Sequence, residues 1–294
     1  MLIEDFIINL FCTIDDIYKE ITKNNKLRKR GESPKLHDSE LITIIIVGEF
    51  YGLNHNKVIW KYFNNHWLKF FPNLCGYSSF SKQIANLHQI IIRIQQYLAQ
   101  KTNSFADKIH ICDGLPLKIA NINRKYNSFK GEAAIGYCAA KDEKYYGFKG
   151  HLIVDSNGIP INYTFTAANI DERDVLAEIT GNIQDLLIGD KGYIRPILKE
   201  EMANQNIDLQ TPLRKNMKDD RPESFVNWIC QIRKRIEVTI SQLTERFKIN
   251  CIKAKDLWHF AGKFTRKICA FTAVAFLNGK VNPENMCKFD LLVE

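Results

Sequence analysis

Three acidic residues, far apart in the chain, stand where a charge has no evident structural use. Asp113 ends an alternating strand-like segment, Asp190 follows the apolar segment 185–189, and Glu237 lies in a long helical stretch. A single aspartate at a strand end usually serves a turn or a cap. Three acids on elements expected to converge instead indicate one shared site. Clustered carboxylates repel one another unless a proton or a divalent cation neutralises them.

The chemistry that suits such a site is phosphoryl transfer. Oxygen-only ligands favour Mg²⁺ or Mn²⁺ over zinc. Two such ions about 3.5–4 Å apart hold the attacking and leaving oxygens of an in-line displacement without a covalent enzyme intermediate. We therefore expect Asp113, Asp190 and Glu237 to hold two Mg²⁺ or Mn²⁺ ions, with a phosphodiester as substrate.

Neighbouring charged residues have local explanations. Asp155 precedes an Asn-Gly turn, and Asp171 and Asp174 lie where a helix begins, so turn formation and capping account for them. Arg233 lies one helical turn before Glu237. It is expected either to hold the Glu237 carboxylate or to meet a phosphate, and the sequence favours neither role.

The elements that position the three acids lie after residue 100. Apolar alternation and β-rich runs predict five strands, at 109–113, 145–155, 159–166, 185–189 and 207–213. Helical patterns follow the third and fourth strands, and two long helices are expected at 223–248 and 258–277. This order is that of an α/β fold with a ribonuclease H-like mixed five-stranded sheet and flanking helices. Parallel first and fourth strands, about 4.8 Å apart, would bring Asp113 and Asp190 together.

The first hundred residues predict an all-helical domain. A capped apolar helix covers 38–52, an aromatic stripe runs from Trp60 to Phe71, and a third helix covers 78–97. These helices form either a helix-turn-helix variant or a packing and dimerisation module. We expect a DNA-end-binding domain at 1–100, a catalytic domain at 101–280 and a C-terminal tail at 281–294.

Composition and charge narrow the class of protein. The 294 residues are 45% hydrophobic and 25% charged, which excludes disordered, collagenous and low-complexity chains. The net charge of +8 gives a mild attraction for polyanions such as DNA. No apolar run approaches the roughly 20 residues that span a bilayer, and no secretion signal is evident, so a cytoplasmic protein is expected.

Cysteine usage points the same way. The eight cysteines form no CxxC pair and no zinc-ligand spacing with histidine. Neither a disulfide framework nor a zinc ribbon is therefore expected. We expect most of these thiols to be buried as small apolar groups.

Five strings in this order give the chain a family resemblance: ICDGLP (111–116), YYGFKGHLI (145–153), TAAN (166–169), GDKGY (189–193) and RIEVTISQL (235–243). The chain resembles the DDE transposases of bacterial insertion sequences, most closely the group numbered nine hundred and eighty-two. The resemblance covers essentially the whole chain. It departs from the family where Gly114 replaces a common serine and where Cys230 and Thr244 replace a tyrosine and a lysine of related transposases.

The resemblance implies a function. Asp113, Asp190 and Glu237 would be the DDE triad of a transposase that binds terminal inverted repeats and catalyses metal-dependent DNA cleavage and strand transfer. The implied partner is double-stranded DNA, on which a homodimer assembles, in the bacterial cytosol or on the nucleoid. Two alternatives stay open: a catalytically inactive DNA-binding descendant, and a metal-dependent nuclease without strand transfer.

Basic and polar residues near the acids, and on the third N-terminal helix, are candidates for DNA contact. Each one taken singly is more often an ordinary solvated residue, whereas the set favours DNA contact. For His151 the alternatives are a proton donor and a packed histidine, of which packing is preferred. His88 would share the outward face of its helix. The candidates are Lys149, His151, Lys191, Arg214, Lys215, Arg233, Arg235, Lys82, Gln83 and Asn86. The basic C-terminal segment, with Arg266 and Lys267, fits either flanking DNA or an exposed helix face.

Overall fold

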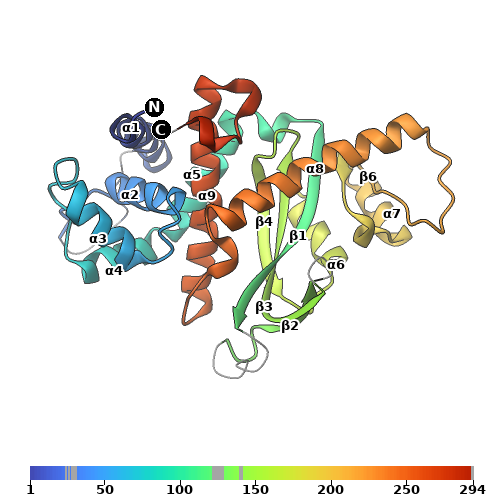
Figure 1. Ribbon diagram of the computed structural model, residues 1–294, viewed down its shortest axis with the longest axis horizontal. Helices are drawn as coiled ribbons and strands as arrows, with labels where there is room; N and C mark the ends of the chain where they lie inside the picture. The colour runs from blue at the N-terminus through green and yellow to red at the C-terminus, as the bar shows by residue number, and fades with distance from the viewer. Residues whose placement is uncertain (24, 26, 28–31, 121–128, 139–141, 293–294) are drawn as a thin grey trace. The chain divides into compact units, whose positions relative to one another are not determined.

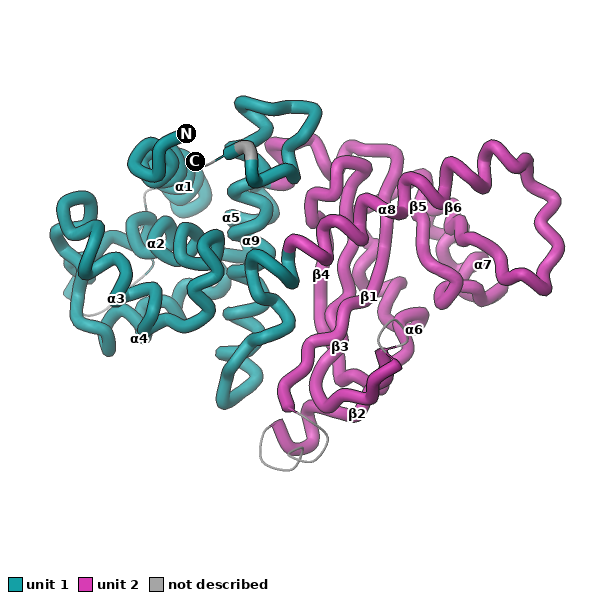
Figure 2. Tube along the Cα trace, in the orientation of Figure 1, with its two compact units in different colours: residues 1–98, 243–294 teal, residues 99–242 magenta. Residues whose placement is uncertain are grey.

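The computed structural model describes residues 1–294 except 24, 26, 28–31, 121–128, 139–141 and 293–294 (Figure 1). Contacts divide the chain into two compact units, which Figure 2 colours separately. Unit 1 combines Met1–Leu98 with Leu243–Glu294, and unit 2 is Ala99–Gln242. Residues 243–280, expected in the catalytic domain, therefore belong with the N-terminal helices. The reason is that their last long helix is apolar nearly all round and packs on those helices.

Unit 1 is built around α2 (Asp38–Phe50), which is buried along almost its whole length. A capping box of His37 and Glu40 starts this helix. Its apolar residues face every direction, so it must be enclosed by other elements. The enclosing helices are α1 (Ile3–Thr22), α3 (Asn56–His66), α4 (Tyr77–Asn86), α5 (His88–Lys101) and α9 (Leu257–Val281).

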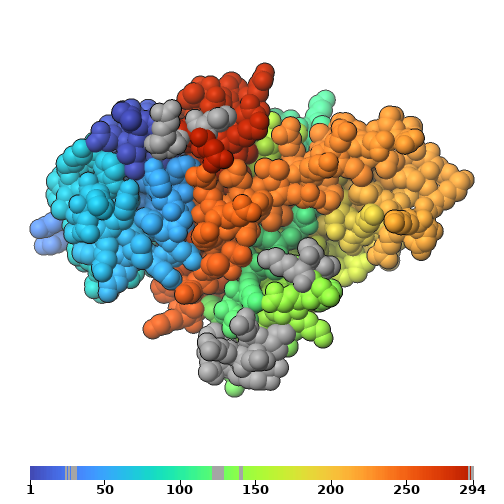
Figure 3. All heavy atoms as spheres, in the orientation of Figure 1, coloured from blue at the N-terminus to red at the C-terminus, as the bar shows by residue number. Residues whose placement is uncertain are grey.

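The closest packing partner of α2 is α9, which comes from the other end of the chain. Side chains from both ends share the surface of this unit (Figure 3). Within the described residues, no helix is long and apolar enough to cross a membrane. Unit 1 thus needs the last fifty residues of the chain to complete its core.

A buried ion cluster joins α2 to α9. Glu49 is fully buried, and its carboxylate lies 2.5 Å from Lys267 Nζ and 2.5 Å from Arg266 Nε. Lys267 also donates to the carbonyl of Phe247 at 2.6 Å, and Arg266 donates to Asn56 Oδ1 at 2.6 Å. Neither cation is on an exposed helix face, because both residues are 1% exposed. One carboxylate therefore serves as counter-charge to two buried cations, and positive charge remains in excess.

Replacing Glu49 tests this cluster. Glu49→Gln leaves Arg266 and Lys267 buried without their counter-charge. We therefore expect the free energy of unfolding to fall by about 3–5 kcal/mol. The measurement is urea unfolding followed by circular dichroism. Glu284→Gln makes the same chemical change at an exposed position of unit 1 and should leave stability unchanged. Equal stability of both variants would contradict the role given to Glu49.

The N-terminal helices differ from the expected ones at two places. The aromatic stripe is not one helix, because Trp67 has φ −127°, outside the helical region, and α3 ends at His66. The expected third helix is interrupted at Leu87, between α4 and α5. The aromatic residues still point inward: Phe63, Trp67 and Phe71 are buried.

Unit 2 contains a sheet of six strands in the described part of the chain. The strands are β1 (Ile109–Ala120), β2 (Ala134–Cys138), β3 (Glu143–Asp155), β4 (Pro160–Ala167), β5 (Asp185–Ile188) and β6 (Ile207–Gln210). The order β4-β3-β1-β5-β6 is antiparallel between its first three strands and parallel between its last three. This confirms the expected ribonuclease H-like sheet. β2 is an additional strand, on the same edge of β3 as β4.

Strand β1 is longer than its sequence suggests. It continues through Pro116 to Ala120, so Asp113 lies inside the strand and not at its end. Beyond Ile111 only β3 pairs with this strand, since pairing with β5 stops there. A proline is tolerated at an unpaired strand edge, where its missing N–H is not needed.

Helices cover the sheet and complete its core. α6 (Glu172–Ile179) and α7 (Pro196–Asn204) contribute Leu176, Leu198 and Met202 to the buried cluster around β1 and β5. α8 (Glu223–Glu245) buries Ile229 and Ile236. Thr239 of α8 donates to the Gly158 carbonyl at 2.8 Å, which fastens the helix to the β3–β4 turn.

The cysteines differ from the expected pattern. All eight are free, but only Cys112 and Cys269 are buried. Cys12, Cys230 and Cys251 are exposed. The expectation that most thiols are buried is therefore wrong, because several lie on the outer faces of their helices and turns.

Candidate active site

Parallel pairing of β1 with β5 sets the positions of Asp113 and Asp190. Ile111 pairs with Ile188 in the register of the two strands. Each aspartate comes two residues later in its own chain segment, so both reach the same height at the carboxyl end of β5. This is the convergence that the sequence predicted for the two residues.

Each aspartate is held by a backbone N–H. Asp113 Oδ1 accepts from the Gly114 N–H at 2.8 Å. Asp190 Oδ1 accepts from the Gly192 N–H at 2.7 Å and caps the short helix η4 (Lys191–Tyr193). Such bonds fix the carboxylates while leaving other lone pairs free.

The glycines of the GDKGY string explain its composition. A Cβ on Gly192 would lie 2.8 Å from Asp190 Oδ1, so a side chain there would push the carboxylate away. A Cβ on Gly189 would lie 2.9 Å from Cδ2 of the buried Tyr193 ring. Both glycines therefore permit a tight turn in which Asp190 is held and Tyr193 fills the space beneath it.

The environment of Asp113 opposes its charge. Burial raises the pKa of Asp113 to about 7, and the neighbouring carboxylates of Asp190 and Glu172 add to the rise. The Gly114 N–H and the positive charge of Arg233 oppose it. In this arrangement the carboxylates need a proton or a cation to sit together.

Glu172 is an acid of this site that the sequence analysis missed. It is the first residue of α6, where an acid suits the helix dipole and gives no signal of another role. Its carboxylate lies against Gly114, where an added Cβ would be 2.7 Å from Oε1. Lys149 Nζ is 3.2 Å from Glu172 Oε1. The glycine that replaces the family's serine thus makes room for this carboxylate.

Glu237 is paired with an arginine side chain, whereas the two aspartates accept hydrogen bonds from backbone N–H groups. Its side chain is 48% exposed on α8, and Arg233, one turn earlier, donates to its Oε1. Of the two roles open to Arg233, the structure shows the first: it holds Glu237. The positive charge of Arg233 also acts on Asp113. Arg233 thereby connects α8 electrostatically to the aspartates.

The three acids differ in how readily they could hold a divalent cation. Among the described residues, no group of three or more His, Cys, Asp or Glu is arranged to hold a metal ion. Asp113 and Asp190 nevertheless offer carboxylate oxygens that a hard cation prefers, and their mutual repulsion calls for positive charge. The two aspartates fit such an ion, whereas Glu237 joins them only if Arg233 releases it.

Two of the three acids that the sequence assigned to turns and caps have those roles. Asp155 accepts from the N–H groups of Asn157 and Ile159 in the β3–β4 turn, and Asp171 caps α6. Asp174 lies in the first turn of α6 and forms an ion pair with Arg195 at 2.6 Å instead of a cap.

The sequence matches a known protein family. Residues 103–256, more than half of the chain and all three acids included, match the family described as Transposase DDE domain. The chain belongs to this family. DDE transposase domains cleave DNA and transfer strands, and they typically use divalent metal ions. No curated protein matches the chain.

A solved structure is also similar to this transposase. It is described as the cryo-EM structure of piggyBac transposase in a synaptic complex with hairpin DNA. The two chains share 10% identity, and the match covers 93% of this chain and 79% of that one with a TM-score of 0.43.

Two residues expected to contact DNA are buried in the transposase. Gln83 is 6% exposed and donates to the Leu36 carbonyl and to Asp38 Oδ1, so it holds the start of α2. His151 is 1% exposed and its Nε2 lies 2.8 Å from Thr166 Oγ1 across the β3–β4 pair. His88 is also buried, against α9. The prediction of DNA contact by these three side chains is wrong, because internal hydrogen bonds hold them inward, whereas the preferred alternative for His151, a packed histidine, is confirmed.

The remaining DNA candidates divide by their partners. Lys149 is largely buried and bound to Glu172, and Arg233 is bound to Glu237. A DNA contact by either would require its ion pair to open. The others are exposed, and DNA contact stays a prediction for Lys82, Asn86, Lys191, Arg214, Lys215 and Arg235.

The buried His151 predicts an acid-sensitive transposase. Burial and Lys149 lower the pKa of His151 to about 4, whereas the unfolded chain takes up the proton near 6.5. Stability contributed by the neutral imidazole is therefore complete above pH 6.5 and falls as the pH drops toward 4. In wild type, His151 should lower the free energy of unfolding by about 1–3 kcal/mol as the pH falls through this range, and His151→Gln should abolish this loss.

The measurement is urea unfolding at pH 4.5 and pH 7.5. Burial raises the pKa of Asp155 to about 6 and gives an opposite slope below that pH. Asp155 is present in both proteins, so the difference between wild type and variant isolates His151. Identical slopes for the two proteins would count against this account.

Proposed function

We propose that this chain is the transposase of a bacterial insertion sequence, of the group numbered nine hundred and eighty-two. It would bind the terminal inverted repeats of its element and catalyse metal-dependent DNA cleavage and strand transfer. The observation that carries the proposal is the β1–β5 register, in which Asp113 and Asp190 follow the paired residues Ile111 and Ile188 by two positions each. Two neighbouring carboxylates of this kind suit the binding of cations beside a phosphodiester.

The triad assignment gives each acid a role. Asp113 and Asp190 would hold a divalent ion between them, and Glu237 would complete the site for a second Mg²⁺ or Mn²⁺ once Arg233 releases it. Bound ions would supply positive charge to the phosphate oxygens during displacement. Gly192 keeps Asp190 oriented, and Arg233 neutralises Glu237 until DNA binds. The freed guanidinium would then lie beside a phosphate.

DNA binding would involve both units. The exposed Lys82 and Asn86 lie on α4 of unit 1, and Lys191, Arg214, Lys215 and Arg235 lie on unit 2. The proposed partner is double-stranded DNA at the element ends and the target. We propose that a homodimer assembles on this DNA, in the bacterial cytoplasm.

Loss of each triad acid should abolish catalysis. Asp113→Asn, Asp190→Asn and Glu237→Gln should each lower Mg²⁺-dependent cleavage of inverted-repeat DNA by at least about a hundredfold. Glu223→Gln, on the exposed start of α8, is the matched control and should keep activity. Wild-type rates in all three triad variants would refute the assignment.

The products of the same assay separate the alternatives. Joined products support a transposase, and cleavage without joining supports a metal-dependent nuclease. The Arg233–Glu237 pair favours the inactive descendant if it never opens. In that case wild type binds the repeats but cleaves nothing, and Arg233→Gln does not restore cleavage.

We expect Asp113 to lower the stability of the folded protein when no metal is bound, and to be required for stabilisation by Mg²⁺. Because its pKa is raised to about 7, ionised Asp113 penalises the folded state above that pH, and the penalty disappears toward pH 4. At pH 8 without metal, the free energy of unfolding of Asp113→Asn should therefore be about 1–3 kcal/mol higher than that of wild type. Mg²⁺ should raise the Tm of wild type but not of the variant.

Thermal unfolding at pH 8, with and without Mg²⁺, measures both effects. Asp174→Asn, an exposed acid of α6, is the control for removing one carboxylate. A Mg²⁺ response that survives in Asp113→Asn would show that the ion binds elsewhere.

A further inference from the structure

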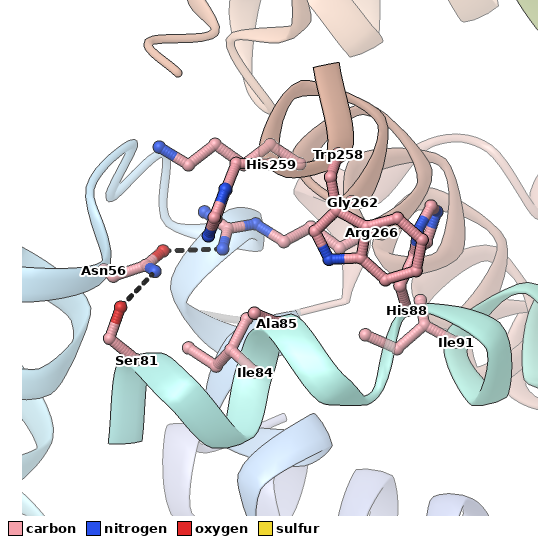
Figure 4. Close-up of a pocket in the computed structure, with 11 residues that line it drawn as sticks. Asn56, Ser81, Ile84, Ala85, His88, Ile91, Trp258, His259, Gly262 and Arg266 are labelled. Atoms are coloured by element: carbon pink, nitrogen blue, oxygen red, sulfur yellow. Dashed lines mark hydrogen bonds between the residues drawn. The ribbon is translucent and has the colours of Figure 1, made fainter. Parts of the chain in front are cut away.

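A pocket in unit 1 lies outside the proposed active site. It is lined by α4, the start of α5, the first turns of α9 and Asn56 at the start of α3, and it is open to solvent on one side. Ile84, Ala85 and Ile91 form its apolar wall. Figure 4 shows Arg266 crossing the pocket, with its guanidinium near Asn56 and the rings of Trp258 and His88 toward the other end.

Arg266 has hydrogen-bonding capacity that its surroundings do not use. It is 1% exposed, its Nε lies against Glu49, and its Nη1 donates to Asn56 Oδ1, which is linked in turn to Ser81. Its Nη2 finds no acceptor among the described residues. An unsatisfied buried guanidinium nitrogen is costly unless an acceptor joins it. A ligand oxygen in the pocket would supply that acceptor.

Positive charge is in excess around this pocket. Burial lowers the pKa of Lys263 to about 8, and the positive charges of Arg266 and Lys267 contribute to the lowering. Burial and the same cations, with Lys253, lower the pKa of His55. Among the described ion pairs, Glu49 and Asp256 are the acids that face this group. The imbalance favours an anionic ligand.

The far end of the pocket suits a flat ring. The Trp258 and His88 rings meet edge to face with centroids 5.1 Å apart, and Trp258 is 51% exposed. His88 Nδ1 is buried and has no partner among the described residues. An exposed indole beside cations is a common platform for a nucleobase.

We propose that this pocket binds one unpaired deoxynucleotide of a DNA strand, its phosphate on Arg266 and Lys263 and its base against Trp258 and His88. The proposal rests on the DNA-binding function proposed above. It fits the position of α4, whose residues Ser81 and Ala85 line the pocket beside the exposed Lys82 and Asn86. A free nucleoside monophosphate has the same chemistry, and the experiment distinguishes the two sources.

The test compares duplexes by fluorescence anisotropy, using the full chain. A blunt 20-base-pair duplex is compared with the same duplex carrying one unpaired terminal thymidine nucleotide, or one abasic nucleotide. We expect wild type to bind the thymidine overhang about five- to tenfold tighter than the blunt end, and Trp258→Leu and Lys263→Gln to lose this preference. Lys280→Gln, on the exposed end of the same helix, should keep it.

Further arms identify the ligand and guard against misfolding. Thymidine monophosphate should abolish the preference by competition, and the abasic overhang should bind like the blunt end. Ala85→Leu fills the pocket without removing a charge and should act like Trp258→Leu, with Tm checked for each variant. Preference for thymidine monophosphate without any overhang preference would overturn the assignment to a DNA strand.

Two other results have separate meanings. Equal binding of all duplexes by wild type, or a preference that survives in Trp258→Leu, Lys263→Gln and Ala85→Leu, overturns the pocket proposal alone. It leaves cleavage by Asp113, Asp190 and Glu237 intact. Failure of wild type to bind any duplex overturns the proposed function as well.

Discussion

Repulsion between carboxylates that the sheet holds close together is the constraint on which the active site depends. The β1–β5 register leaves Asp113 and Asp190 no freedom to move apart, and burial weakens the screening that water would provide. Glu172 adds a third negative charge to the same place. The surrounding residues respond to this charge: Arg233 approaches from α8, and Lys149 neutralises Glu172 from β3. An unbalanced site of this kind is prepared for cations.

Unit 1 has the opposite imbalance, an excess of buried positive charge. There one carboxylate, Glu49, lies between Arg266 and Lys267, and positive charge remains in excess. Each unit therefore carries a buried charge imbalance that its own side chains do not remove. Metal ions are the ligands proposed for the first, and a phosphate is the ligand proposed for the second. The two ligands are the components that a DNA-processing enzyme brings together.

Sequence patterns predicted those features that depend on periodicity. All five expected strands are present, and Asp113 lies near Asp190 because strand order makes β1 and β5 neighbours, although Asp113 lies inside β1 and not at its end. Features that depend on individual side-chain contacts were not predicted. Gln83 is polar and was placed outside, yet its hydrogen bonds to Leu36 and Asp38 bury it. Glu172 gave no signal, because an acid in a first helical turn is unremarkable in sequence.

The membership of α9 in unit 1 has a genetic consequence. α9 completes the core around α2, from which it is far removed in the sequence. A ribosome must therefore synthesise α9 before the N-terminal helices find this partner. A premature stop codon ahead of α9 would then spare the carboxylate-bearing sheet but leave the helical unit unfinished.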